Sequence, residues 1–219
     1  MQEILLVRHG QASYGAHDYD NLSELGHQQS FWLGAHLQQL GFVPSLAVDG
    51  TLKRHVQTLD QVAKSLHISN QASDKAFSEI NIKAIFTAYR NKYDNLPAFE
   101  QDTKLLNAAL RMVLTAWFEA RISTGGETWQ GYIMRINQGL ERFKNQGDNI
   151  LLITSGGAIA AAVGATLNLD AATQVAIFTK LHNSSVTKLI RTKSGLELHS
   201  LNNVAHLETA DRKGALTYV

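Results

Sequence analysis

The sequence of 219 residues contains no cysteine and only two prolines, Pro44 and Pro97. Without cysteine the chain forms no disulfide, no zinc–thiolate centre and no thiol nucleophile. No stretch approaches the ~18 consecutive apolar residues that a membrane-spanning helix needs. The N-terminus also lacks the basic and apolar segments of a signal peptide. These absences lead us to expect a cytoplasmic protein with no membrane partner.

Charge of either sign is not in excess, since 20 Lys and Arg residues face 19 Asp and Glu residues. No basic stripe suggests nucleic acid as a partner, and no acidic tail suggests a solvating segment. The hydrophobic share of 44% and the charged share of 18% are ordinary for a soluble globular protein. We expect one domain over residues 1–219 with an insertion at about 77–126. The oligomeric state stays open, with a dimer as one alternative.

Short apolar runs alternate with segments of helical periodicity, which is typical of parallel strands joined by helical crossovers. The fold class that this order predicts is α/β, a three-layer αβα sandwich with a mostly parallel sheet and a helical insertion over its active edge. We expect residues 211–219, which are polar, to be loose. The predicted strands are 4–7, 45–48, 149–154, 185–191 and 196–201, and the predicted helices are 23–40, 52–66, 105–117, 128–143 and 156–167.

Polar residues follow several predicted strands at the point where each strand ends. Arg8 and His9 follow the first strand, Arg54 opens the helix after the second, and Ser155-Gly156-Gly157 follows the long apolar strand. Because the carboxyl ends of parallel strands meet at one edge of a sheet, we expect these residues to share a pocket. Guanidinium groups and a glycine-rich helix N-terminus suit a phosphate. The expected ligand is therefore a small phosphate ester, or a phosphate or sulfate ion.

Six segments carry a resemblance to a known family over roughly residues 4–207. They resemble the motifs of the histidine phosphatase superfamily, in its phosphoglycerate-mutase-like branch. The segments are Leu6-Val7-Arg8-His9-Gly10, Leu22-Ser23-Glu24-Leu25-Gly26 with Gln29, Leu52 with Arg54, Gln57 and Thr58, Gly126-Glu127-Thr128 with Arg135, and the C-terminal pieces at 183–187 and 203–207.

The resemblance implies a covalent mechanism. His9 attacks phosphorus, and water then hydrolyses the phosphohistidine. Arg8 and Arg54 keep the imidazole neutral and hold the phosphoryl oxygens. Glu79 is the candidate general acid, with a plain exposed glutamate as the alternative, and Glu127 is expected to orient an arginine. The resemblance implies no metal and no cofactor. The implied substrate-binding residues are Arg8, Gln11, Ser13, Arg54, Ser155 and Gly156.

One position departs from the family. Relatives carry a second catalytic histidine where this sequence has Ser155. A serine hydroxyl donates one neutral hydrogen bond, and loss of one preorganised donor typically lowers the rate ~10²–10³-fold. The resemblance also implies fewer side chains that bind the phosphate, because Ala12 and Gly15 stand where the family has a threonine and an asparagine. Ser13 compensates in part. We therefore expect a slow phosphatase. A catalytically impaired phosphoester-binding or regulatory protein is the alternative, and a phosphoglycerate mutase is less favoured.

Residues 80–120 are expected to set the choice of substrate because they form the insertion over the pocket. Tyr89, Arg90 and Tyr93 are the predicted contacts. His182 precedes a loop that borders the pocket in this interpretation, and it is the candidate to replace the missing histidine. His55, His36 and Lys53 are expected to be solvated.

Overall fold

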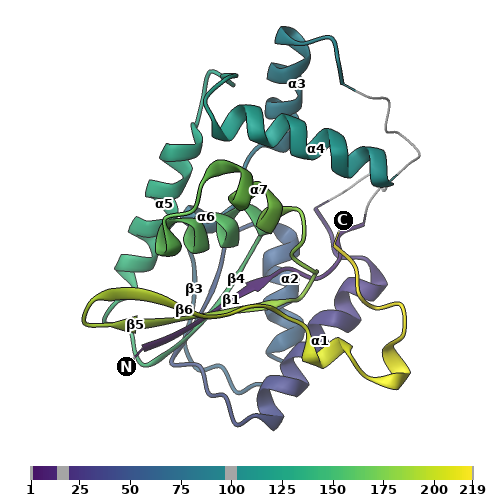
Figure 1. Cartoon of the computed structure of the whole chain (residues 1–219). Coiled ribbons are helices and arrows are strands. Elements are labelled where there is room, and N and C mark those ends of the chain that lie inside the picture. The colour runs from purple at the N-terminus through teal and green to yellow at the C-terminus, as the bar shows by residue number, and fades with distance from the viewer. Residues whose placement is uncertain (1, 14–19, 97–102, 219) are drawn as a thin grey trace.

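The computed structural model describes residues 2–13, 20–96 and 103–218, apart from the side chains of residues 103 and 104 (Figure 1). The strands are β1 Gln2–Arg8, β2 Leu46–Asp49, β3 Gln71–Ser73, β4 Asn149–Thr154, β5 Val186–Thr192 and β6 Gly195–Asn203. The helices are α1 Glu24–Gln39, α2 Lys53–Val62, α3 Ile82–Lys92, α4 Thr103–Phe118, α5 Trp129–Arg142, α6 Gly156–Leu167 and α7 Ala171–Phe178. Three short 3₁₀ helices are η1 Lys75–Phe77, η2 Ala205–Leu207 and η3 Ala210–Arg212.

The six strands form one sheet in the order β3-β2-β4-β1-β5-β6. β3, β2, β4 and β1 run parallel, whereas β5 pairs antiparallel with β1 and β6 antiparallel with β5. In the register of β1 and β4, Arg8 lies opposite Thr154. Both strands therefore end level, and His9 and Ser155 leave the sheet side by side. This edge is where open parallel sheets bind ligands.

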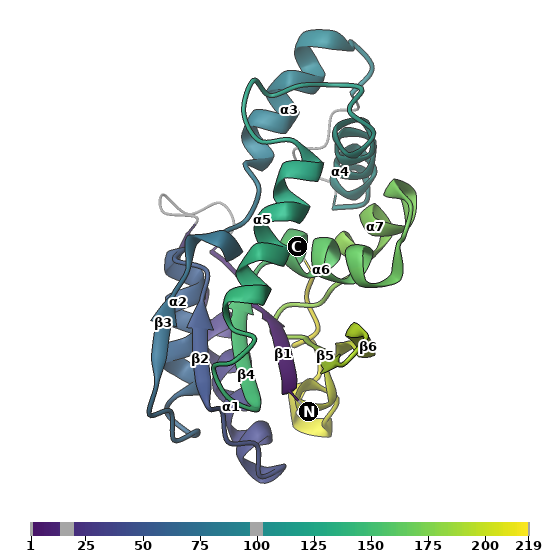
Figure 2. The ribbon, with the colours of Figure 1, turned by 90° about the vertical axis from the view of Figure 1, so that its left-hand side faces the viewer.

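Alternating residues of the central strands pack on opposite faces of the sheet. Leu5 and Val7 of β1 join a core cluster with α1 and α2, whereas Ile4 and Leu6 join one with α5 and α6. Each fully buried aliphatic side chain contributes ~1.5–3 kcal/mol to the free energy of unfolding. The result is the three-layer α/β sandwich that the sequence predicts, and Figure 2 shows its layers turned by 90°.

Helices α3 and α4 lie beyond the edge of the sheet at which β1 and β4 end (Figures 1 and 2). The predicted helix at 105–117 is confirmed as α4, whereas the sequence analysis predicts no helix over the residues of α3, which is wrong. Ile85 and Tyr89 are buried four residues apart on α3, and Asn81 caps the helix by accepting from Ala84 N. The helical period is present in the sequence, since Ile82, Ile85 and Tyr89 are spaced at i, i+3 and i+7.

Two further elements were not expected, the three-residue strand β3 and the short helix α7, which Asp170 caps. Leu40 and Leu105 belong to predicted helices, yet they are 68% and 42% exposed. Both stand at the end of their helices, where the apolar stripe has turned away from the core. Among the described residues, no helix is long and apolar enough to span a membrane.

Candidate active site

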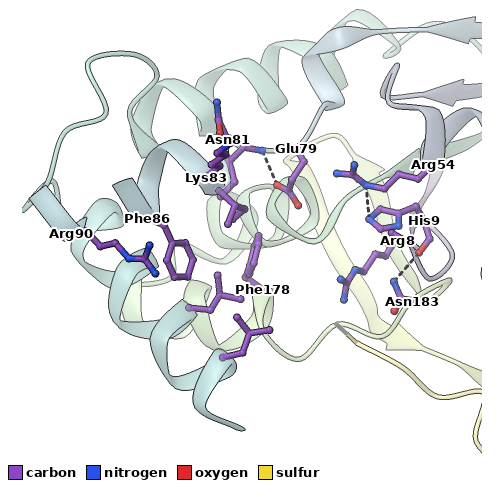
Figure 3. A pocket seen from close by; sticks show the side chains of 15 residues that line it. Arg8, His9, Arg54, Glu79, Asn81, Lys83, Phe86, Arg90, Phe178 and Asn183 are labelled. Carbon is purple, nitrogen blue, oxygen red and sulfur yellow. Dashed lines mark hydrogen bonds between the residues drawn. The ribbon is translucent and has the colours of Figure 1, made fainter. Parts of the chain in front are cut away.

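His9 is the residue around which the site is arranged. Its ring Nδ1 lies 2.7 Å from the Gly10 carbonyl oxygen, and Arg54 Nε donates to its Nε2 over 3.1 Å (Figure 3). A carbonyl oxygen only accepts, so Nδ1 carries the proton. Arginine Nε only donates, so Nε2 carries the lone pair. The two contacts thus fix one tautomer and leave a nucleophilic nitrogen at Nε2.

The pKa of His9 lies well below its usual value of 6.5. Burial is the largest cause, because the side chain is 5% exposed and an imidazolium there loses its hydration. The guanidinium groups of Arg54 and Arg8 act in the same direction. The neutral ring is the form that the proposed attack on phosphorus requires.

A constrained turn between β2 and α2 positions Arg54. Thr51 lies in the left-handed region with φ of 68°, which costs a β-branched residue ~1–3 kcal/mol. At Gly50 a Cβ atom would lie 2.4 Å from the Phe77 carbonyl oxygen, so only glycine fits. Arg54 Nη1 also pairs with Asp20 Oδ1 at 2.6 Å. The guanidinium therefore bridges a carboxylate and the reactive imidazole.

Arg8 is held by the end of the chain. Its Nη1 donates to the carbonyl oxygens of Leu181 and Tyr218. The expectation of a loose segment at residues 211–219 is therefore wrong for its described part, since the Ala215 carbonyl also accepts from Gln29 Nε2 at 2.7 Å. Composition alone does not show that polar tail residues meet the buried amide of Gln29.

Glu79 enters the site after η1. Its Oε1 accepts from Ile80 N over 2.9 Å, and its Oε2 accepts from Gly157 N over 3.2 Å. The carboxyl group thus lies at the N-terminus of α6. A Cβ at Gly157 would lie 2.2 Å from Glu79 Oε1, so glycine is needed for this approach. In Figure 3 the carboxyl group of Glu79 lies on the same side of the cavity as Arg54 and His9.

Glu127 orients an arginine, as the sequence predicts. Its two carboxylate oxygens pair with Arg135 at 2.7 and 2.8 Å. Arg135 Nη1 in turn donates to the carbonyl oxygens of Lys75 and Ser78, over 3.1 and 3.3 Å. This pair therefore holds the segment that leads into Glu79.

Arg8, His9, Arg54 and Glu79 converge on one cavity of about 740 Å³. The other predicted binding residues do not line it. Gln11 Oε1 accepts from Ser23 Oγ at 2.8 Å, and Ser13 N donates to Asn21 O. The remaining lining residues are Ala12, Ile80, Asn81, Ile82, Lys83, Phe86, Arg90, Leu106, Leu110, Phe178 and Asn183.

Gly156 and Ser155 also lie outside this lining. A Cβ at Gly156 would be 3.8 Å from Arg8 Nε, so the residue lies behind that guanidinium. Ser155 is fully buried. A role for either residue in binding the substrate stays a prediction.

The insertion contributes to the cavity, but through partly different residues than predicted. Arg90 lines it, whereas the prediction for Tyr89 and Tyr93 is wrong. Tyr89 is 5% exposed, its ring lies 4.9 Å from the Tyr93 ring with the planes inclined by 45°, and its hydroxyl donates to Asn95 Oδ1. The cavity face of α3 carries Ile82, Phe86 and Arg90, spaced at i, i+4 and i+8. That spacing was the signal in the sequence.

His55 is not solvated, contrary to the prediction. It is fully buried, and its Nε2 lies 2.6 Å from Ser155 Oγ. Its pKa is lowered to about 3, by burial first and by Arg54 second. The prediction failed because the first turn of α2 packs against the end of β4, so His55, two residues after the exposed Lys53, faces inward.

The loop after His182 borders the cavity through its next residue. Asn183 lines the cavity, and its Nδ2 donates to the His9 carbonyl oxygen over 3.3 Å. The His182 ring instead lies against Tyr218, with ring centroids 5.7 Å apart. The loop therefore borders the cavity as expected, but the residue that lines the cavity is Asn183 and not His182.

The fold and the site together define a class: an α/β protein with a neutral imidazole among arginines at the strand ends of its sheet. Residues 4–204 match the family model of the histidine phosphatase superfamily, branch 1. The chain therefore belongs to this superfamily, and the family that the motifs predicted is confirmed. No curated protein resembles the sequence closely enough to count as a match.

Several solved structures share the fold. A phosphoserine phosphatase from Entamoeba histolytica with 3-phosphoglyceric acid has a TM-score of 0.69 and 17% identity, covering 94% of this chain and 100% of its own. A mycobacterial glucosyl-3-phosphoglycerate phosphatase with inorganic phosphate gives 0.65 and 21%, covering 95% and 100%. The Bacillus stearothermophilus protein YhfR gives 0.70 and 17%, covering 95% and 100%.

Three buried neutral histidines, His9, His55 and His206, predict that acid destabilises the protein. The folded-state pKa values of all three are lowered, so below about pH 6.5 the unfolded chain binds protons that the folded chain does not. The free energy of unfolding should fall as the pH drops, by up to ~1.4 kcal/mol per pH unit for each histidine. Urea unfolding between about pH 7 and about pH 4 measures this slope.

His55→Gln removes one of these groups and should reduce the slope by about one proton. His67→Gln, at an exposed position, is the control and should leave the slope unchanged. A His55→Gln protein with the wild-type slope would contradict the assignment.

Proposed function

We propose that the protein hydrolyses a phosphate monoester through a phosphohistidine on His9, without a metal ion. The observation that carries the proposal is the fixed tautomer of His9, with its Nδ1 on the Gly10 carbonyl and its Nε2 lone pair facing Arg54 Nε at the cavity. Family membership supports it, as do the structural relatives that carry phosphatase names.

Binding begins with an exchange of partners. The phosphate dianion takes the donors of Arg54 and Arg8, which face His9 Nε2 and backbone carbonyls in the free protein. Arg54 Nε then donates to a phosphoryl oxygen instead of to the ring. Nε2 attacks phosphorus as the bond to the leaving oxygen breaks, and the two guanidinium groups hold the equatorial oxygens. The positive charge that develops on the ring is shared with the Gly10 carbonyl through Nδ1–H.

Glu79 is proposed to donate the proton that the leaving oxygen needs. It lines the cavity beside Arg54 and takes hydrogen bonds from the backbone of Ile80 and Gly157. After the alcohol leaves, the same carboxylate accepts a proton from water, which attacks phosphorus and releases His9. One carboxyl group thus acts first as an acid and then as a base.

Rapid-quench labelling tests the phosphohistidine directly. We expect acid-labile, base-stable phosphate on His9 when the protein meets a labelled phosphate ester, and we expect turnover to survive EDTA. His9→Ala should abolish both label and turnover while the protein still folds, because the residue lies at a strand end rather than in the apolar core.

Unchanged turnover in His9→Ala would exclude His9 as the nucleophile. Wild-type protein that binds phosphate but gives neither label nor product would favour the alternative of a phosphoester-binding or regulatory protein.

The cavity wall away from His9 indicates the kind of leaving group. Phe86, Leu106, Leu110 and Phe178 line it together with the cations of Lys83 and Arg90. Figure 3 shows Phe86 and Phe178 between the phosphoryl end of the cavity and Arg90. An apolar group gains ~25 cal/mol for each Å² that it buries there, whereas a polar group must find a hydrogen-bond partner. We propose that the substrate carries an apolar or aromatic leaving group.

Relative rates on two esters test this class. We expect a higher kcat/KM for naphthyl phosphate than for phosphoserine. Phe86→Ala should lower kcat/KM for the naphthyl ester ~10-fold, because a pair of aromatic rings contributes ~0.5–1.5 kcal/mol beyond the apolar area that it buries, and should change it less for phosphoserine.

Phe31→Ala is the control, since Phe31 is 44% exposed on α1 and does not line the cavity. Equal losses on both esters in Phe86→Ala, accompanied by a lower melting temperature, would contradict the proposed leaving group.

A further inference from the structure

His55 and Ser155 form a buried pair that the proposed mechanism does not use. Both side chains are fully buried, and His55 Nε2 lies 2.6 Å from Ser155 Oγ. The His55 ring lies next to the ring of His9, with the centroids 5.6 Å apart and the planes inclined by 31°. A buried polar pair next to the His9 ring can fix the position of the elements around that ring.

Ser155 gives up its usual local role to make this bond. It is the N-cap residue of α6, yet its side chain makes no capping hydrogen bond. At the same position Ser23 caps α1 and Thr128 caps α5 through their side-chain oxygens. In α6 the Glu79 carboxylate accepts from Gly157 N instead. The Ser155 hydroxyl is therefore committed to His55 rather than to its own helix.

The bond joins the two elements that must stay aligned in the site. His55 follows Arg54 on the first turn of α2, whose N-cap Leu52 makes no side-chain capping bond. Ser155 follows Thr154, whose carbonyl oxygen accepts from His9 N at 2.9 Å. One hydrogen bond thus connects the helix that carries Arg54 with the strand end beside His9.

The turn before α2 has room for the ring only because it contains a glycine. A Cβ atom at Gly50 would lie 2.5 Å from His55 Nδ1. Burial and the neighbouring Arg54 keep the pKa of His55 at about 3, so the ring is neutral and adds no charge that would repel the guanidinium. Its contribution is therefore geometric.

We propose that His55 is a positioning residue for phosphoryl transfer, which through its hydrogen bond to Ser155 holds Arg54 in line with His9 Nε2. The inference rests on the proposed function. During the reaction Arg54 moves its donor from the imidazole to a phosphoryl oxygen, and only a fixed helix start keeps that oxygen in line. A displacement of ~1 Å in such a group lowers a rate by as much as ~100-fold.

Three substitutions of His55 distinguish the effect of its hydrogen bond to Ser155 from the effect of its side-chain volume. In His55→Gln the terminal amide reaches the place of the ring Nε2 and keeps the bond to Ser155. His55→Asn is one bond too short, and His55→Ala lacks the group entirely. We expect kcat on a generic phosphate ester to fall up to ~100-fold in the Asn and Ala variants, and to stay within about fivefold of wild type in the Gln variant. Inhibition by inorganic phosphate should weaken much less than kcat falls.

Ser155→Ala removes the other partner of the hydrogen bond, and it deletes only one buried oxygen atom. It should lower kcat about as much as His55→Ala, and the double variant should be no slower than the slower single variant, because both lose the same bond. His206→Ala is the matched control. It breaks another buried histidine–serine bond, to Ser184 at 2.8 Å, and should lower the melting temperature without a comparable fall in kcat.

Three results of the kcat measurements would overturn the inference. These are wild-type kcat in both His55→Ala and Ser155→Ala, losses that multiply in the double variant, and a Gln variant as slow as the Asn variant. If His55→Ala does not fold, the kcat values of Ser155→Ala, His55→Gln and His55→Asn still test the inference. Wild-type protein that never acquires phosphate on His9 refutes the proposed function. Wild-type protein that labels normally, with His55 variants that label equally fast, refutes only the positioning role.

Discussion

The contact between Arg54 Nε and His9 Nε2 is the interaction on which the rest of the site depends. It is a hydrogen bond from a permanent cation to a buried neutral imidazole, and it exists only because the Gly10 carbonyl holds the proton on Nδ1. The central place of β1 in the sheet sets His9, and the strained turn at Thr51 sets Arg54. A change in either element would leave the lone pair or the guanidinium out of reach of a shared phosphoryl group.

The free site keeps its cations satisfied by groups that a phosphate can replace. The His9 imidazole faces Arg54 Nε and two backbone carbonyls face Arg8, whereas Asp20 pairs separately with Arg54 Nη1. A dianion offers stronger charge-assisted hydrogen bonds than a neutral carbonyl or imidazole does. Preorganisation therefore comes from the surrounding segments, which are the turn before α2, the chain end near Tyr218 and the N-terminus of α6. Each of these belongs to a different part of the sequence.

What the sequence predicts depends on how local the signal is. β4 and α6 have the predicted bounds, because a run of apolar residues and a Gly156-Gly157 pair mark them without reference to other elements. The three residues Arg8, His9 and Arg54 follow from strand ends meeting at one edge. The inward turn of His55 does not, because it depends on how α2 is rotated against β4, a strand about 100 residues away in the sequence.

The ionisation of His9 in the free protein tests the central claim most directly. ¹⁵N NMR of the imidazole reports protonation and tautomer together. The account predicts a neutral ring protonated at Nδ1 at about pH 6, where an ordinary histidine is mostly charged. His9→Gln assigns the signal. An imidazolium at about pH 6, or a neutral ring protonated at Nε2, would contradict the account, since neither form presents a lone pair to phosphorus.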